Sequence, residues 1–320
     1  MDQTWLDDLG LRLTHRCPLP LDVPFTAPQA HTLGVSRETL RHLVRAELVR
    51  PQLRGVYVAS QAPDTMLMRA RGLALVLPES AVVTDRTAAW LHGVAILPRT
   101  ARTVVPPVQA FFTTDTRMLR PGVSSGRRAL LASDVTVVHG VRVTTALRTA
   151  LDLGRLLWRF DALAAIDGFL RIGVPHELMW AEVGRFRGFR GVIQLRALVP
   201  LGDRRAESPA ESALRLHWYD AGLPRPQLQV WVYDDHGVGR YRLDIADEDR
   251  LFVAEYDGED HHTEDEDRSY DEERRDWCSR KRGWSFEIFT KADIYARGPD
   301  PLPRLAGSWA AARRRLLWTP

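Results

Sequence analysis

The sequence predicts a multidomain protein of mixed α+β and α/β structure. Its 320 residues are about two average domains in length. Its hydrophobic content of 45% and charged content of 27% are typical of soluble globular proteins. Helical and strand-like patterns alternate along the whole chain, and we expect three parts: residues 1–95, 96–200 and 201–320.

Composition excludes several classes of protein. The two cysteines, Cys17 and Cys278, lie far apart in the sequence, so a disulfide framework or a four-cysteine zinc site is excluded. The first residues carry acids rather than the basic start of a signal peptide. Apolar runs such as residues 73–77 are much shorter than the ~20 residues that cross a bilayer. We therefore expect a soluble cytoplasmic protein without a membrane partner.

The near-neutral net charge of +3 conceals an uneven distribution. Residues 1–200 carry an excess of basic side chains, whereas residues 201–320 carry an excess of acidic ones. The first part therefore suits a polyanionic partner, and the second supplies a surplus of carboxylates.

Residues 25–58 have the pattern of two short helices followed by a small hairpin. Ser36 is a suitable N-cap for the second helix, which we expect to bury its leucines on one face. The opposite face carries arginines at a spacing of four residues, and Gly55 follows another arginine in the predicted hairpin turn. These arginines are Arg37, Arg41, Arg45 and Arg54.

This order of elements is typical of a winged helix-turn-helix, whose second helix enters the major groove of DNA. Arginines on that helix reach phosphates or guanine edges. The alternative is that the arginine row is only the solvated face of a structural or protein-binding module.

Residues 81–93, with the sequence AVVTDRTAAWLHG, resemble the segment after the winged helix in AbiEi-like antitoxins. This resemblance, over about residues 25–95, implies a DNA-binding module that often represses its own operon. His92 and Gly93 are typical of a helix C-terminus, which gives His92 a structural role.

Residues 96–200 contain strand-like pieces followed by helices, without a spacing that indicates catalysis. The stretch RFRGFRG at residues 185–191 interleaves arginine with phenylalanine. It suits stacking on single-stranded nucleic acid, or it is a basic loop before a helix.

The last part is predicted to have the order helix, three strands, helix, strand, helix. Ser208, Pro209 and Glu211 form a capping-box pattern at the first helix. Asp244 lies within an apolar strand, and Glu255 and Asp257 end the next one. Residues two apart on a strand share a face, so Glu255 and Asp257 point to the same side. If the strand of Asp244 pairs with theirs, the three carboxylates converge, and a divalent cation such as Mg²⁺ is the natural occupant. Such an ion would activate water against a phosphodiester.

Residues 207–296 resemble the DUF559 domain, a relative of the very-short-patch repair endonucleases in the PD-(D/E)XK nuclease superfamily. The motifs that carry this resemblance are Ser208-Pro209 before Glu211, residues 221–224, Arg242-Leu243-Asp244, Glu255-Tyr256-Asp257-Gly258, His261-His262 and residues 270–284.

The resemblance implies roles for individual residues. Asp244 and Glu255 would be metal ligands, His262 a catalytic histidine and Glu211 an accessory acid. Asp257 stands where the superfamily has a lysine, so Arg275 or Lys281 would have to replace that cation, or His262 would act as the base. Glu211 is equally explained by helix capping alone.

Two functions follow from these patterns. The first is a DNA-binding protein whose last domain is a Mg²⁺-dependent endonuclease. The alternative is a non-catalytic transcriptional regulator or type IV antitoxin-like protein, with a degenerate nuclease fold and a toxin-like partner protein. A homodimer is compatible with both.

Overall fold

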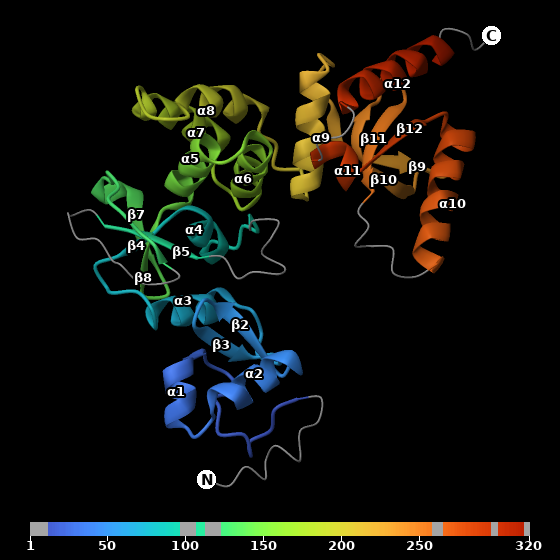
Figure 1. The fold of residues 1–320 in the computed structure, drawn as a ribbon. Coiled ribbons are helices and arrows are strands. Elements are labelled where there is room, and N and C mark those ends of the chain that lie inside the picture. The colour runs from blue at the N-terminus through green and yellow to red at the C-terminus, as the bar shows by residue number, and fades with distance from the viewer. Residues whose placement is uncertain (1–11, 97–106, 113–122, 258–264, 296–299, 317–320) are drawn as a thin grey trace. The chain divides into compact units, whose positions relative to one another are not determined.

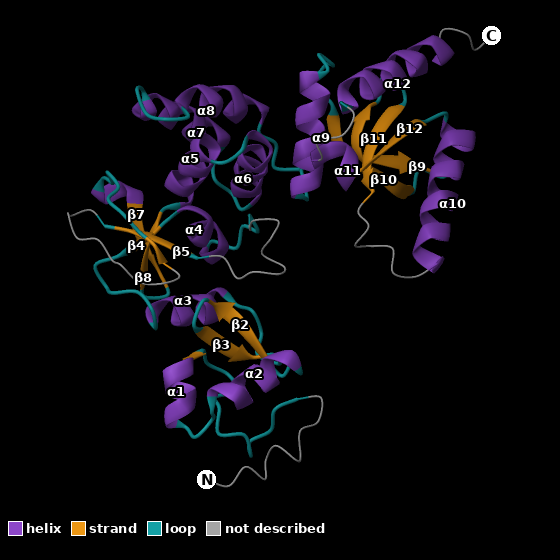
Figure 2. Ribbon diagram, in the orientation of Figure 1, coloured by secondary structure: helices purple, strands orange, loops and turns teal. Residues whose placement is uncertain are grey.

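The computed structural model describes residues 12–96, 107–112, 123–257, 265–295 and 300–316 (Figure 1). Helices and strands are interspersed along the chain, which confirms the mixed α and β prediction (Figure 2). The chain divides into two compact units, residues 1–152 and 153–320. This division falls inside the predicted middle part, and the three-part organisation with boundaries near 95 and 200 stays a prediction.

The first unit begins with a small helical and antiparallel sheet structure. The sheet has the strand order β1-β3-β2. Ser36 caps α2, since its Oγ accepts a hydrogen bond from the backbone N–H of Thr39 at 3.0 Å. Leu40 and Leu43 of α2 are buried against Phe25, as the leucine spacing predicted. The elements are β1 (Phe25–Thr26), α1 (Ala27–Thr32), α2 (Arg37–Arg45), β2 (Val49–Leu53) and β3 (Val56–Ala59).

A second sheet follows in the same unit, with the strand order β6-β5-β4-β8-β7. Leu73, Val83, Leu91 and Val143 belong to its hydrophobic core. Nε2 of His92 lies 2.8 Å from the carbonyl oxygen of Thr144, which places this histidine in a structural role. The elements are α3 (Met66–Ala74), β4 (Val82–Val83), α4 (Asp85–Leu91), β5 (Val108–Phe111), β6 (Val123–Ser124), β7 (Val135–Val138) and β8 (Val141–Thr144).

Buried ion pairs join the second sheet to helix α5 (Ala146–Leu156). Arg148 contacts Asp134 at 2.6 Å and Asp152 at 2.9 Å. Arg128 contacts Asp85 at 2.5 Å and Asp152 at 3.4 Å. Burial of charges is tolerated where each has an opposite partner, so this network fixes the register of α5 on the sheet.

Helices form the start of the second unit. The buried guanidinium of Arg215 contacts the buried carboxylate of Asp167 at 2.5 Å, which joins α6 to α9. The helices before α9 are α6 (Arg159–Arg171), α7 (His176–Glu182) and α8 (Val192–Leu198), with short 3-10 turns at residues 183–186 and 199–201.

The rest of the second unit is a four-stranded mixed sheet between helices. Its strand order is β12-β11-β10-β9; β11 and β12 are parallel, and the other neighbours are antiparallel. Trp218 of α9 packs on Phe252, and Trp277 of α10 packs on Tyr241. The predicted order of helix, three strands, helix and strand is present, and two helices rather than one follow the last strand. The elements are α9 (Pro209–Asp220), β9 (Gln227–Tyr233), β10 (Gly239–Asp247), β11 (Phe252–Asp257), α10 (Asp265–Arg282), β12 (Ser285–Thr290), α11 (Lys291–Tyr295) and α12 (Pro301–Leu316).

Among the described helices, none has both the length and the apolar character that a membrane span requires.

Candidate functional site

Helix α2 presents a row of arginines to solvent. Arg37, Arg41 and Arg45 are exposed, and each is four residues from the next. An α-helix rises 1.5 Å per residue, so their Cα atoms follow one another at about 6 Å along the axis. Arg54 is also exposed, beside Gly55 in the turn between β2 and β3, where Gly55 has a φ of +81°. The structure therefore leaves all four predicted DNA contacts accessible.

The predicted carboxylate site lies where β10 and β11 run side by side. Ile245 pairs with Ala254, and the next step of this antiparallel register sets Asp244 across from Glu255. Burial raises the pKa of the Asp244 carboxyl to about 7, and the nearby carboxylates of Glu211 and Glu255 act in the same direction. Asp244 therefore lies near Glu255 and Glu211, whereas the predicted site combined Asp244 and Glu255 with Asp257.

Glu255 is held by an arginine that the sequence did not single out. Nη1 and Nη2 of Arg274, on α10, donate to the two carboxylate oxygens of Glu255 at 2.8 and 2.7 Å. The Glu255 side chain is 3% exposed and that of Arg274 is 14% exposed. Such a bidentate contact is the strongest form of arginine–carboxylate pairing. The Glu255 carboxylate also raises the pKa of Arg274 above its ordinary value, against the opposing effect of burial.

The other predicted residues are distributed around this pair. Arg275 lies 3.4 Å from Glu255 and 3.5 Å from Asp257, the residue at which the DUF559 resemblance leads us to expect a lysine. Lys281 is exposed in the last turn of α10. It stands six positions after Arg275, about 9 Å along the helix axis. His262 lies outside the described residues.

Glu211 takes part in the start of α9, but only the Ser208 half of the predicted capping box is formed, since the Glu211 carboxylate binds the N–H of Glu207 and not that of Ser208. Its backbone N–H donates to the Ser208 Oγ at 3.1 Å, which caps α9. Its carboxylate Oε2 accepts hydrogen bonds from the backbone N–H of Glu207 at 3.0 Å and from Nε2 of Gln229 at 2.9 Å. These contacts account for Glu211 as part of the helix start.

The carboxylates as arranged do not fit a Mg²⁺ ion. Mg²⁺ needs oxygen ligands at about 2.0–2.1 Å in octahedral geometry. Both oxygens of Glu255 already accept hydrogen bonds from Arg274, and an oxygen of Glu211 is engaged by the helix start. In the part of the chain that the structure describes, no group of three or more His, Cys, Asp or Glu side chains could hold a metal ion.

The role of Arg274 could have been found from helical spacing. Trp277 and Cys278 of α10 belong to the hydrophobic core beneath the helix. Residues three and four positions apart share a helix face, so Arg274 lies on the face that covers the sheet. A basic residue on that face requires an acidic partner, and Glu255 on β11 provides it.

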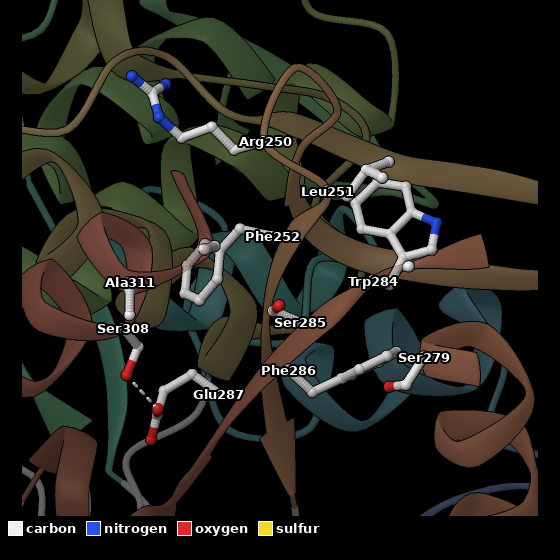
Figure 3. A pocket seen from close by; sticks show the side chains of 12 residues that line it. Arg250, Leu251, Phe252, Ser279, Trp284, Ser285, Phe286, Glu287, Ser308 and Ala311 are labelled. Atoms are coloured by element: carbon white, nitrogen blue, oxygen red, sulfur yellow. Dashed lines mark hydrogen bonds between the residues drawn. The ribbon is translucent and has the colours of Figure 1, made fainter. Parts of the chain in front are cut away.

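A cavity of about 710 Å³ lies at the other end of β11 (Figure 3). It is lined by the start of β12 together with Arg250, Phe252 and Ser308, and Ser308 donates to Glu287 at 2.5 Å. None of the predicted catalytic residues lines it. This cavity is therefore separate from the carboxylate site.

Comparison with known proteins identifies one domain and two relatives. Residues 80–201 match the model of the AbiEi antitoxin C-terminal domain. The uncharacterized protein MT2308 of Mycobacterium tuberculosis (strain CDC 1551 / Oshkosh) is 33% identical over 242 residues, which cover 75% of this chain and 84% of the relative. The same values hold for the uncharacterized protein Rv2248 of strain H37Rv.

The matched region confirms the antitoxin part of the sequence prediction. It includes residues 81–93, whose motif carried the AbiEi resemblance. The match also extends through the middle region, for which the sequence motifs gave no family. The DUF559 resemblance of residues 207–296 stays a prediction.

Proposed function

This chain belongs to the family of the two mycobacterial proteins and carries an AbiEi antitoxin C-terminal domain, and we propose that it is a DNA-binding regulator of the antitoxin type. In this proposal, residues 25–59 form a winged helix that docks α2 in the major groove. The hairpin of β2 and β3 is the wing, and a toxin-like protein is the second partner.

The exposed arginine row of α2 is the observation that carries this proposal. Arg37, Arg41 and Arg45 lie on the helix face opposite the buried Leu40 and Leu43. A guanidinium can bind a phosphate or bind O6 and N7 of guanine in a bidentate manner. The domain match supports the same function from a different part of the chain.

DNA binding is tested by fluorescence anisotropy with the DNA upstream of the protein's own gene and with a shuffled duplex. Arg41→Ala should weaken binding to the specific duplex by about 1–3 kcal/mol if Arg41 contacts a base. Arg196→Ala is the matched control, because Arg196 is an exposed arginine on α8 of the second unit. Equal affinities of the wild type and Arg41→Ala for the specific duplex would contradict the proposal.

The sequence also predicts a Mg²⁺-dependent endonuclease, and the proximity of Asp244 to Glu255 is the observation on its side, whereas the pairing of Glu255 with Arg274 is the observation against it. A nicking assay with and without Mg²⁺ separates it from a purely regulatory function. Metal-dependent cleavage that Asp244→Ala abolishes would support the nuclease, whereas DNA binding without cleavage would support the regulator.

A further inference from the structure

We infer that the guanidinium of Arg274 takes the place of a metal ion beside Glu255, in the region of the DUF559 resemblance (residues 207–296). In this position Arg274 keeps Glu255 from binding a divalent metal ion. This inference goes beyond DNA regulation, because it assigns a closed internal ion pair to the place where the family resemblance implies a metal. It concerns the chain's own α10 and β11 and is independent of DNA recognition.

The first observation is the geometry of the pair formed by Arg274 and Glu255. Arg274 binds both oxygens of Glu255, at 2.8 and 2.7 Å, so the planar guanidinium faces the whole carboxylate edge. A longer contact of 3.5 Å joins Nη1 of Arg274 to the carbonyl oxygen of Arg242 on β10. One side chain of α10 thus reaches both strands that carry the predicted ligands.

Burial makes the ion pair of Arg274 and Glu255 hard to separate. Glu255 is 3% exposed and Arg274 is 14% exposed, so neither group can exchange its partner for bulk water without moving α10. Removal of one member of a buried pair leaves an uncompensated charge, which is far costlier than the loss of a surface pair. A metal ion that competes for Glu255 must therefore displace Arg274 and leave its charge buried.

A second arginine adds positive charge beside the carboxylates of β11. Arg275 adds contacts to Glu255 at 3.4 Å and to Asp257 at 3.5 Å. The two neighbouring arginines of α10 thus face the two acidic residues of β11, and a divalent cation would add to the positive charge of this pair. The two arginines therefore weaken the attraction of Glu255 and Asp257 for a divalent ion, although Asp244 and Glu211 also lie near Glu255.

The test is a calorimetric titration of the full-length protein with Mn²⁺. Wild type should give no saturable heat at millimolar Mn²⁺. Arg274→Met keeps most of the side-chain volume but frees Glu255, and it should bind Mn²⁺ at least about tenfold more tightly than wild type. Adding Glu255→Gln to this variant should abolish the gain. Arg275→Met is the matched control, with the same charge change one residue along α10, and it should produce less gain than Arg274→Met.

Two results would overturn the inference. Saturable Mn²⁺ binding by wild type that Glu255→Gln removes would show that Arg274 does not exclude the metal. Absence of Mn²⁺ binding by a folded Arg274→Met variant would show that Arg274 does not occupy a place that a metal ion could take. Circular dichroism checks the fold of each variant, and Arg274→Gln, which also removes the positive charge, replaces Arg274→Met if that protein does not fold. A failure of DNA binding would leave these outcomes unchanged, so the two proposals are tested separately.

Discussion

The pair formed by Arg274 and Glu255 should be a strong contributor to the stability of the second unit. Arg274→Ala leaves the carboxylate of Glu255, which is 3% exposed, without its bidentate partner. Two unit charges about 4 Å apart interact by about 4 kcal/mol at an effective dielectric constant of 20. Truncation of one partner of a buried pair typically costs about 3–5 kcal/mol. We therefore expect Arg274→Ala to lower the free energy of unfolding by about 3–4 kcal/mol.

Urea unfolding followed by tryptophan fluorescence measures this change, because Trp218, Trp277 and Trp284 all lie in the sheet and helices around the pair. Arg275→Ala is the control: its contacts of 3.4 and 3.5 Å are longer, and its side chain is 24% exposed. We expect a loss of about 1 kcal/mol or less for that variant. The double variant Arg274→Ala with Glu255→Gln should be more stable than Arg274→Ala alone, because it buries no unpaired charge.

Equal losses for Arg274→Ala and Arg275→Ala would refute this reasoning. So would a double variant that is less stable than Arg274→Ala, since the remaining charge would then not be the source of the loss.

Two further predictions concern other parts of the chain. Burial lowers the pKa of His92 below its ordinary value of 6.5. Near that pH the folded state therefore binds fewer protons than the unfolded state, and the free energy of unfolding should fall as the pH drops below 6.5. In His92→Gln this part of the pH dependence should disappear, and urea unfolding at several pH values measures it. An unchanged pH profile would contradict the lowered pKa of His92. Gly191 has a φ of +79°, and a Cβ there would lie 1.8 Å from the carbonyl oxygen of Arg155, so Gly191→Ala should destabilise the protein by more than the ~1–2 kcal/mol of left-handed strain alone. Gly188→Ala is its control, since Gly188 has a φ of +83° and nothing within 4 Å of a Cβ; melting temperatures compare the two, and equal losses would contradict the steric argument.

Local patterns predicted many of the elements around the proposed sites. The Ser36 cap and leucine spacing located α2, and Gly55 located the turn between β2 and β3. In the last part, Ser208 located the start of α9 and Gly283, with a φ of +76°, follows the end of α10. These signals act within a few residues, so the sequence contains them directly.

Contacts between distant residues could not be predicted in the same way. The parallel pairing of β4 with β8 joins Val83 to Val143, and each strand is too short to show a clear alternation. Asp244 lies near Glu255, as strand pairing would allow, but the partner of Glu255 lies 19 residues further along the chain. Helical spacing from Trp277 and Cys278 places Arg274 on the covered face of α10, but the carboxylate that it binds is decided by how α10 packs on the sheet.

The salt dependence of DNA binding tests the central claim most directly, namely that the arginines of α2 bind DNA. Each phosphate contact contributes about 0.9 to the slope of log K against log salt concentration. The variant with Arg37, Arg41 and Arg45 all changed to alanine should therefore lower that slope by up to about 2.7 and weaken binding at every salt concentration. A slope and an affinity equal to those of wild type would contradict the account.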